Sequence, residues 1–237
     1  MRRRRENRSV PVFVFALVLA TSAAWAAGEA PGLYEKMCAR CHGLAGDGKG
    51  QAGVALAFNG RPPRDFTRGR FRFQSTPTGA APTDDDLRRT IGLGLPATAM
   101  PGFADLLAAD EIDALVKTVR AFAKEPLPEA PPIDLGQPPA DDAESRARGQ
   151  RLYGDLGCAV CHGESADGRG RSVADLRNED GSAARPVDLR RPWGFRGGGT
   201  AADVVLRLAT GLAGTPMPSY LDSATVADLW DVAHWLG

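Results

Sequence analysis

Residues 149–163 have the sequence Gly-Gln-Arg-Leu-Tyr-Gly-Asp-Leu-Gly-Cys-Ala-Val-Cys-His-Gly. The last six of them form a Cys-x-x-Cys-His-Gly motif that also occurs 120 residues earlier, at residues 38–43. Two thiols three residues apart lie on one turn of a helix. They can add to the two vinyl groups of a haem while the adjoining imidazole binds its iron. The motifs therefore predict two covalently bound haems c, held by Cys38, Cys41, Cys158 and Cys161, with His42 and His162 as iron ligands.

A Cys-x-x-Cys pair can also serve a zinc site, a redox-active dithiol or structural disulfides. A zinc site needs about four nitrogen or sulfur ligands, whereas each motif supplies three. The chain has only four cysteines and three histidines, so no spare cysteine completes either site. A thioredoxin-like dithiol normally follows a strand, and the histidine after both pairs would be unexplained. Haem attachment is therefore the favoured interpretation.

The motif belongs to a longer internal repeat, whose offset shrinks from 120 to 114 residues along the chain. The other matched features are Gly46–Gly50 with Ala166–Gly170, Thr83 and Asp86 with Thr200 and Asp203, Met100-Pro101 with Met217-Pro218, and the apolar positions Ile112, Leu115, Val116, Val119 and Phe122 with Val226, Leu229, Trp230, Ala233 and Leu236. Ordered features separated by small deletions indicate duplication of a whole domain. We therefore predict a first unit at residues 27–124 and a second unit at residues 144–237.

Residues 125–143 between the units contain six prolines, five acidic residues and no basic residue. Such a composition cannot bury a core and tends to stay extended. We therefore predict a Pro-rich linker between two nearly independent units. The first unit, with 13 basic and 11 acidic residues, has a charge of +2, the linker −5, and the second unit, with 11 basic and 12 acidic residues, −1.

The spacing of apolar residues predicts helices and shows no strand alternation. Apolar pairs four residues apart predict a buried face on the helix that leads into each motif (Leu33 with Met37, Leu152 with Leu156). Threonine N-caps and glycine ends predict one further helix in each unit (Thr83 and Thr200; Gly92, Gly94 and Gly211).

The second axial ligand of each iron follows by elimination among four methionines. Met1 lies in the N-terminal segment, and Met37 directly precedes Cys38 and cannot reach the opposite face of the haem. Met100 and Met217 remain, one in each unit, each after a glycine-broken helix and before a proline that fixes φ. We predict that both bind iron; the alternative is that they fill gaps in the core.

Arginines occur in matching loops of the two units. Arg61 and Arg185 are candidates for contacts to haem propionates, because a guanidinium pairs with a carboxylate through two parallel hydrogen bonds; the alternative is a solvated loop. A basic cluster is either a docking patch for an acidic redox partner or a solvated loop (Arg61, Arg64, Arg68, Arg70 and Arg72). His234 has no counterpart in the first unit and is interpreted as a packed or exposed side chain rather than a ligand.

The N-terminus has a basic segment, an apolar stretch at Val10–Ala20 and the small residues Ala24-Trp25-Ala26. This order predicts a signal peptide at residues 1–26 and a periplasmic protein, with an uncleaved anchor in the inner membrane as the alternative. The rest of the chain has a charge of −4, which argues against nucleic-acid binding through phosphates. With a single long uncharged stretch, the chain is not a polytopic membrane protein.

The run Gly149–Gly163 and the run Thr215-Pro216-Met217-Pro218 resemble class I cytochromes c, and the first unit is similar with a lead-in one residue shorter. The chain after the signal resembles periplasmic di-haem, two-domain cytochromes c of bacteria. This resemblance implies an all-α fold of two tandem class I cytochrome c domains, each with one covalently bound haem c, joined by the Pro-rich linker. It also implies that the first and last helices of each domain cross, and that the protein transfers electrons.

Histidine and methionine together saturate an iron and leave no position for a substrate. The sequence therefore predicts an electron carrier, and not an enzyme, that shuttles single electrons between redox partners such as a respiratory complex, a periplasmic dehydrogenase or a terminal reductase or oxidase. One alternative is a dedicated haem subunit of a periplasmic dehydrogenase or respiratory complex. A less favoured alternative is a haem enzyme, such as a di-haem peroxidase or a thiosulfate-oxidising cytochrome, which needs an iron that is open or bound by histidine or cysteine.

Overall fold

The computed structural model describes residues 30–56, 62–125 and 127–237, so the predicted signal at residues 1–26 and Arg61 lie outside the described residues. The α-helices are α1 (Ala30–Met37), α2 (Ala39–His42), α3 (Gln51–Leu56), α4 (Asp84–Leu93), α5 (Ala109–Ala121), α6 (Ala143–Asp155), α7 (Cys158–His162), α8 (Ala201–Thr210) and α9 (Val226–Leu236). Two 3₁₀ turns span Phe66–Arg68 and Pro192–Gly194. The described ranges contain no named strand, which confirms the all-α prediction. None of their helices combines the length and hydropathy that crossing a membrane requires.

The two predicted threonine caps are present. Thr83 Oγ1 accepts from the backbone N–H of Asp86, whose carboxylate accepts from the backbone N–H of Thr83, and Thr200 with Asp203 repeats this box at the start of α8. Each box satisfies backbone donors that the first helical turn leaves without a partner. The helices end at Gly94 and Gly211, whereas Gly92 lies inside α4, so it does not end the helix as predicted.

Each unit has its own core, in which its first helix packs on its last. In the first unit α1 packs on α5, and in the second α6 packs on α9. The prediction that Met37 lies on the buried face of its lead-in helix is wrong, because its side chain is 36% exposed. The aromatic side chain that α1 buries is Tyr34, and the one that α6 buries is Tyr153; α6 also buries Ser145. An aromatic ring with one polar end fits this interface better than a thioether, because its hydroxyl finds a partner inside.

The linker lies along both units. The backbone N–H of Ile133 donates to the Ser75 carbonyl of the first unit at 2.8 Å. The Leu135 carbonyl accepts from Trp230 Nε1 of the second unit at 2.9 Å. The side chains of Ile133 and Leu135 pack against the core of the second unit. The expectation of an unattached spacer is therefore wrong, because two apolar side chains among the prolines give the linker a surface to bind.

The two units are in direct contact, which corrects the prediction that they are nearly independent. Arg207 of α8 donates to the carbonyls of Arg72 at 3.1 Å and Gln74 at 2.6 Å. Arg89 of α4 forms a salt bridge with Asp203 of α8, with 2.6 Å between Nη2 and Oδ1. Composition and charge gave no sign of this contact, because it uses single arginines placed by the fold.

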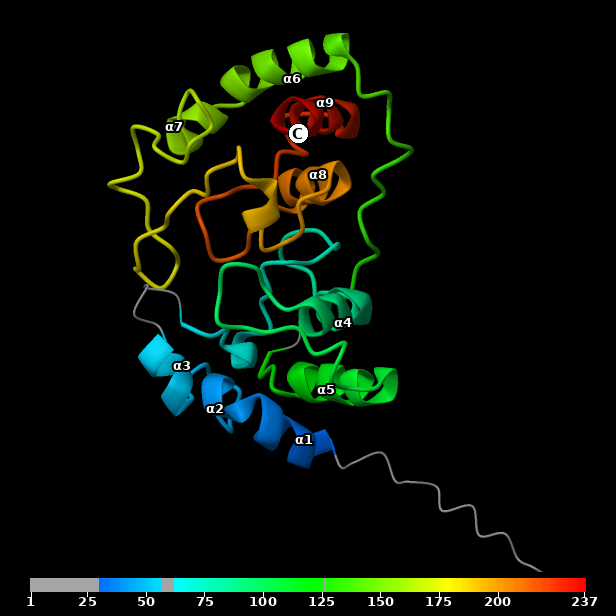
Figure 1. Ribbon diagram of the computed structural model, residues 1–237, viewed down its shortest axis with the longest axis vertical. Coiled ribbons are helices and arrows are strands. Elements are labelled where there is room, and N and C mark those ends of the chain that lie inside the picture. Colours follow the sequence, from blue (N-terminus) through cyan, green and yellow to red (C-terminus); the bar gives the residue numbers. More distant parts are fainter. Residues whose placement is uncertain (1–29, 57–61, 126) are drawn as a thin grey trace, which may run out of the picture.

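In the resulting arrangement, α1, α2 and α3 lie at one end of the molecule and α6 and α7 at the opposite end (Figure 1). The helices α4 and α8 lie between them (Figure 1). The two Cys-x-x-Cys-His motifs, on α1 to α2 and on α7, therefore point to opposite ends of the molecule. The helices that precede the two methionine loops lie in the middle, where the units meet.

Candidate functional site

The helical turn of each motif brings its cysteines and histidine together. Cys38 lies just before α2, and its carbonyl accepts from the backbone N–H groups of Cys41 at 3.0 Å and His42 at 2.9 Å. All four cysteines are free thiols, so the structure contains none of the disulfides considered as an alternative. Burial raises the pKa of Cys38 to about 11 and raises that of Cys158. Burial therefore favours the neutral form of these two thiols over the thiolate.

No group of three or more His, Cys, Asp and Glu side chains in the described part of the chain is arranged to hold a metal ion by itself. The zinc interpretation therefore lacks a fourth donor in space as well as in the sequence.

The two motif histidines have the same orientation and tautomer. His42 Nδ1 lies 3.2 Å from the Arg64 carbonyl, and His162 Nδ1 lies 3.2 Å from the Val187 carbonyl. Because a carbonyl can only accept, each Nδ1 carries the proton and each Nε2 keeps a lone pair for a metal. Burial lowers the pKa of both imidazoles, although each hydrogen bond acts in the opposite direction. Both rings are therefore set up as neutral ligands.

The loops that supply these carbonyls are those singled out for their arginines. These loops span Arg61–Asp65 and Arg185–Asp188. In the described residues of each loop, the group that contacts the motif histidine is a backbone carbonyl. Arg185 is exposed. Whether Arg61 and Arg185 contact propionates stays a prediction.

A tyrosine braces each motif, and the sequence analysis missed both. Tyr34 Oη donates to the Gly43 carbonyl at 2.8 Å, and Tyr153 Oη donates to the Gly163 carbonyl at 2.7 Å. Both bonds are buried and connect the first helix of the unit to the residue after the motif histidine. The tyrosines lie four and five residues before the first cysteine, and their recurrence in the repeat was the signal that pointed to them.

The two methionine loops are structural duplicates. The backbone N–H of Leu95 donates to the Met100 carbonyl at 3.1 Å, and Leu212 donates to the Met217 carbonyl at the same distance. Each methionine N–H donates to a threonine hydroxyl two residues earlier, from Met100 to Thr98 at 3.1 Å and from Met217 to Thr215 at 3.2 Å. The threonines were also missed, although Thr-x-Met occurs in both loops.

Glycine at the end of the preceding helix allows these loops to close. Gly94 has φ of 68° and Gly211 has φ of 65°, the left-handed region that favours glycine. A Cβ on Gly94 would lie 2.7 Å from the Met100 carbonyl oxygen, and one on Gly211 would lie 3.0 Å from that of Met217. The methionine is thus held against the helix end by backbone contacts that a larger residue would prevent.

In the second unit, the methionine loop contacts the cysteine motif. Tyr220, three residues after Met217, lies close enough to Cys158 for its hydroxyl to oppose the rise that burial causes in the pKa of that thiol. It also packs on the cluster formed by Tyr153, Cys158 and Ala166. In the first unit Phe103 holds the matching position after Met100 and lies in one core with Tyr34 and Phe66. The fold therefore gathers the cysteines, the histidine and the methionine loop around one interior in each unit.

The donor set fits a covalently bound haem. Each unit offers two thiols on one turn, an imidazole with an available Nε2, and a thioether on a closed loop. The buried Nε atoms of Arg196 and Arg207 have no hydrogen-bond partner in the described part of the chain. Buried guanidinium nitrogens need an acceptor, and carboxylates such as haem propionates are acceptors of the matching charge.

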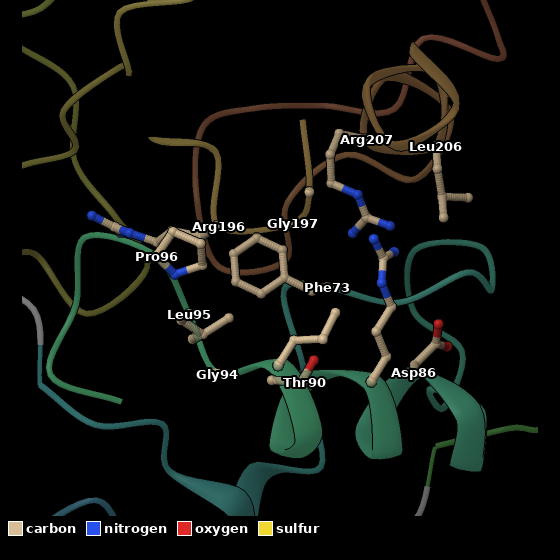
Figure 2. Close-up of a pocket in the computed structure, with 13 residues that line it drawn as sticks. Phe73, Asp86, Thr90, Gly94, Leu95, Pro96, Arg196, Gly197, Leu206 and Arg207 are labelled. Carbon is tan, nitrogen blue, oxygen red and sulfur yellow. The ribbon is translucent and has the colours of Figure 1, made fainter. Parts of the chain in front are cut away.

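Arg196 and Arg207 line a cavity of about 110 Å³ between the units. Figure 2 shows the ring of Phe73 and the side chain of Arg207 in this region. The Arg207 guanidinium lies 5.9 Å from the centroid of that ring. Burial lowers the pKa of Arg207 to about 10. These two arginines lie outside the predicted set, because nothing in their sequence context distinguishes them.

The basic cluster of the first unit faces the second unit. Arg68 and Arg70 form salt bridges with Glu179 at 3.3 and 2.5 Å. The charge of Arg72 contributes to lowering the pKa of Asp180, after hydrogen bonds from Ser182. Burial lowers the pKa of Arg64 to about 10. Arg68 and Arg70 therefore link the two units while staying about half exposed, and the docking role of the cluster stays a prediction.

His234 is a packed side chain of the interface between α6 and α9. It is 5% exposed, and its Nδ1 lies 2.7 Å from Ser145 Oγ.

Comparisons with known proteins agree with this geometry. Residues 23–117 match the family model described as cytochrome c oxidase, cbb3-type, subunit III, and residues 146–237 match that of cytochrome c. Two curated relatives named cbb3-type cytochrome c oxidase subunit CcoP, from Azospirillum sp. (strain B510) and Azospirillum brasilense, are 30% and 29% identical over 210 residues. These alignments cover 86% of this chain and 60% of each relative, so the chain spans less than two thirds of their length.

Among solved structures, a chain of the reducing HAO-like protein complex of Kuenenia stuttgartiensis is 33% identical, with a TM-score of 0.81. The match covers 88% of this chain and 94% of that chain. One superposition thus includes most of both units, which supports their relative placement as well as the fold of each.

Proposed function

The chain belongs to the class I cytochrome c family, with two domains of that family in tandem, and on this basis we propose that it is an exported, periplasmic carrier of single electrons. Two cytochrome c domains imply two covalently bound haems c per chain. When bound, each haem supplies an iron that changes reversibly between the ferric and ferrous states. The proteins that deliver and accept the electrons are redox proteins of the same compartment.

The duplicated geometry supports one assignment of the residues that hold the haems. Cys38 and Cys41 would hold one haem covalently, and Cys158 and Cys161 the other. His42 and Met100 would bind the first iron, and His162 and Met217 the second. With both axial positions filled, neither site offers a place for a substrate, which favours a carrier over a haem enzyme.

The chain's own groups keep the ligands in place when the charge of the site changes. The carbonyls of Arg64 and Val187 fix the two imidazoles through Nδ1. The hydroxyls of Thr98 and Thr215 fix the backbone of the two methionines. Ligands that do not move keep the reorganisation on electron transfer small, and the apolar cores exclude water.

The observation that carries the proposal is the repeated Nδ1-to-carbonyl hydrogen bond, because it leaves Nε2 available in both units. Its test is the optical spectrum of the purified, haem-loaded protein. We expect a low-spin ferric spectrum with a sulfur-to-iron band for both haems, and no binding of carbon monoxide by the ferrous form. A high-spin haem that binds carbon monoxide in the unmodified protein would contradict the carrier assignment and favour an enzyme.

A second candidate is a dedicated haem subunit of a larger redox complex. The names of the relatives favour it, because two are subunits of an oxidase and the solved relative is part of an HAO-like complex. Both candidates share the same chemistry and differ in their affinity for a partner. Size-exclusion chromatography of the native protein from its own cell extract separates them: a carrier elutes near the mass of one chain, and a subunit co-elutes with its complex.

A further inference from the structure

The two Cys-x-x-Cys-His faces have the same fold but different surfaces. Three of the exposed large apolar side chains lie on the first face, with exposed fractions of 36%, 71% and 60% (Met37, Leu44 and Val54). On the second face, residues 152–175 expose no large apolar side chain, and Val187, whose carbonyl faces His162, is 37% exposed near this motif. Exposed apolar side chains that gather around one feature are typical of interaction sites, whereas scattered ones need no explanation.

Backbone contacts bring the segments that carry Leu44 and Val54 together beside the first motif. The Cys41 carbonyl accepts from Gly50 N–H at 3.2 Å, and the Gly50 carbonyl accepts from Val54 N–H at 3.0 Å. A Cβ on Gly53 would lie 2.2 Å from the Cys41 carbonyl oxygen, so α3 lies directly against α2. Leu44 follows α2 by two residues. We call the surface of Met37, Leu44, Val54, Arg40 and Lys49 the α2–α3 face.

The two faces also differ in charge, and the more apolar face is the more basic one. At the repeat offset of 120 residues, exposed Leu44 corresponds to exposed Glu164, exposed Arg40 to Val160, and exposed Val54 to exposed Ala174. Residues 38–56 contain two basic residues and one acidic residue, whereas residues 158–176 contain two basic and three acidic residues. The first face therefore combines apolar side chains with a net positive charge, and the second is polar with a net negative charge.

The position of the face also suits a partner. The helices α1 and α2 lie at the end of the molecule opposite α6 and α7, and α3 lies beside them (Figure 1). Arg68 and Arg70, which could compete for an acidic protein, are about half exposed and already paired with Glu179. Among the described residues, no such ion pair joins the charges of the α2–α3 face to the second unit.

We propose that the α2–α3 face is the docking surface for an acidic redox protein, and that electrons enter or leave the chain there and not at the matching face of the second unit. This inference rests on the proposed function. The apolar side chains supply the desolvated centre of the contact and Arg40 and Lys49 supply its charged rim, the usual composition of a transient interface. Complementary charge mainly raises the association rate and loses its effect as salt screens it.

The repeat offers a matched pair of variants. Val54→Glu and Ala174→Glu each add one negative charge to an exposed position at the same place in the repeat, in the full-length protein loaded with both haems. The probe is an acidic flavodoxin in its hydroquinone form, which donates one electron, and the readout is the second-order rate constant for haem reduction by stopped flow. At low ionic strength we expect Val54→Glu to lower this constant about tenfold and Ala174→Glu to change it less than about twofold. The difference should disappear in high salt.

Two controls separate a docking effect from a change in the haem. Reduction by ascorbate, a small molecule, and the midpoint potentials of both haems should match the unmodified protein in both variants. Equal effects of the two substitutions, or a larger effect of Ala174→Glu, would overturn the assignment of the docking face. Failure of the unmodified protein to accept electrons from any donor would instead overturn the proposed function, so the two failures are distinguishable.

Discussion

Arg89 of α4 forms a salt bridge with Asp203 of α8 across the boundary between the two units, with 2.6 Å between Nη2 and Oδ1. Asp203 is also the third residue of its helix and accepts from the backbone N–H and hydroxyl of Thr200. These hydrogen bonds hold the carboxylate in place independently of Arg89. Less side-chain entropy is therefore lost when the ion pair forms. Together with the hydrogen bonds of Arg207, this contact holds the two units against each other.

Removing Arg207 should loosen that pair. Arg207→Ala deletes two charged hydrogen bonds to the carbonyls of Arg72 and Gln74, a loss of about 2 kcal/mol at the interface. Small-angle scattering of the unmodified protein should give one compact envelope at low and at high salt. We expect Arg89→Ala combined with Arg207→Ala to increase the radius of gyration in high salt. Arg177→Ala is the control, because Arg177 donates to carbonyls of its own unit.

The two motif tyrosines should be equivalent in stability measurements. Tyr34→Phe and Tyr153→Phe each leave a buried glycine carbonyl without its donor, at a cost of about 1 to 3 kcal/mol. Urea unfolding followed by circular dichroism measures this cost. Unchanged midpoints in both variants would show that the hydroxyls do not brace the motifs.

The second unit should lose stability in acid through Asp231. Burial by itself raises the pKa of Asp231, but hydrogen bonds from Arg148 and Ser145 outweigh it, so the pKa is lowered from its ordinary value of 3.8. A lowered pKa means that the contribution is complete above this ordinary value and is lost as the pH falls through the folded-state pKa.

We therefore expect Asp231→Asn to destabilise the protein at pH 7, and the difference from the unmodified protein to shrink below about pH 4. Thermal unfolding across this pH range measures the difference. The control is Asp222→Asn at an exposed position, and we expect this substitution to leave the unfolding temperature unchanged across the pH range. A difference for Asp231→Asn that does not change with pH would show that its carboxylate charge is not what stabilises the interface.

The methionines should behave as iron ligands. Met100→Ala or Met217→Ala should abolish the sulfur-to-iron band of one haem, lower its midpoint potential and allow carbon monoxide to bind, because methionine favours the ferrous state. Met37→Ala, at an exposed methionine, should leave the spectrum unchanged. A variant of Met100 or Met217 with an unchanged spectrum and potential would exclude that residue as a ligand.

The sequence predicts the helical fold well because the evidence for it is local. The threonine caps, the glycine ends at Gly94 and Gly211 and the spacing of apolar residues on α5 and α9 are each local signals, and the structure confirms them. The duplication adds a second copy of each signal. The same local reasoning fails for Met37, because which side of α1 is buried depends on α5.

The contacts that shape the site are harder to predict, because they join residues far apart in the chain. The Arg64 and Val187 carbonyls act through the backbone and carry no side-chain signal. Arg196 and Arg207 are placed at the interface by the packing of two units, and the linker's composition suggested no packing at all. Tyr34, Tyr153 and the two Thr-x-Met pairs recur between the units, so a complete comparison of the repeat would have found them.

The most direct test of the account is the number of covalently bound haems per chain, measured by the pyridine haemochrome assay after extraction with acid acetone. Two independent attachment sites predict two haems in the unmodified protein and one in the variant that carries Cys158→Ala and Cys161→Ala. Cys38→Ala with Cys41→Ala should likewise leave one. Two retained haems in either variant, or fewer than two in the unmodified protein matured with its haem-attachment machinery, would contradict the assignment of both motifs.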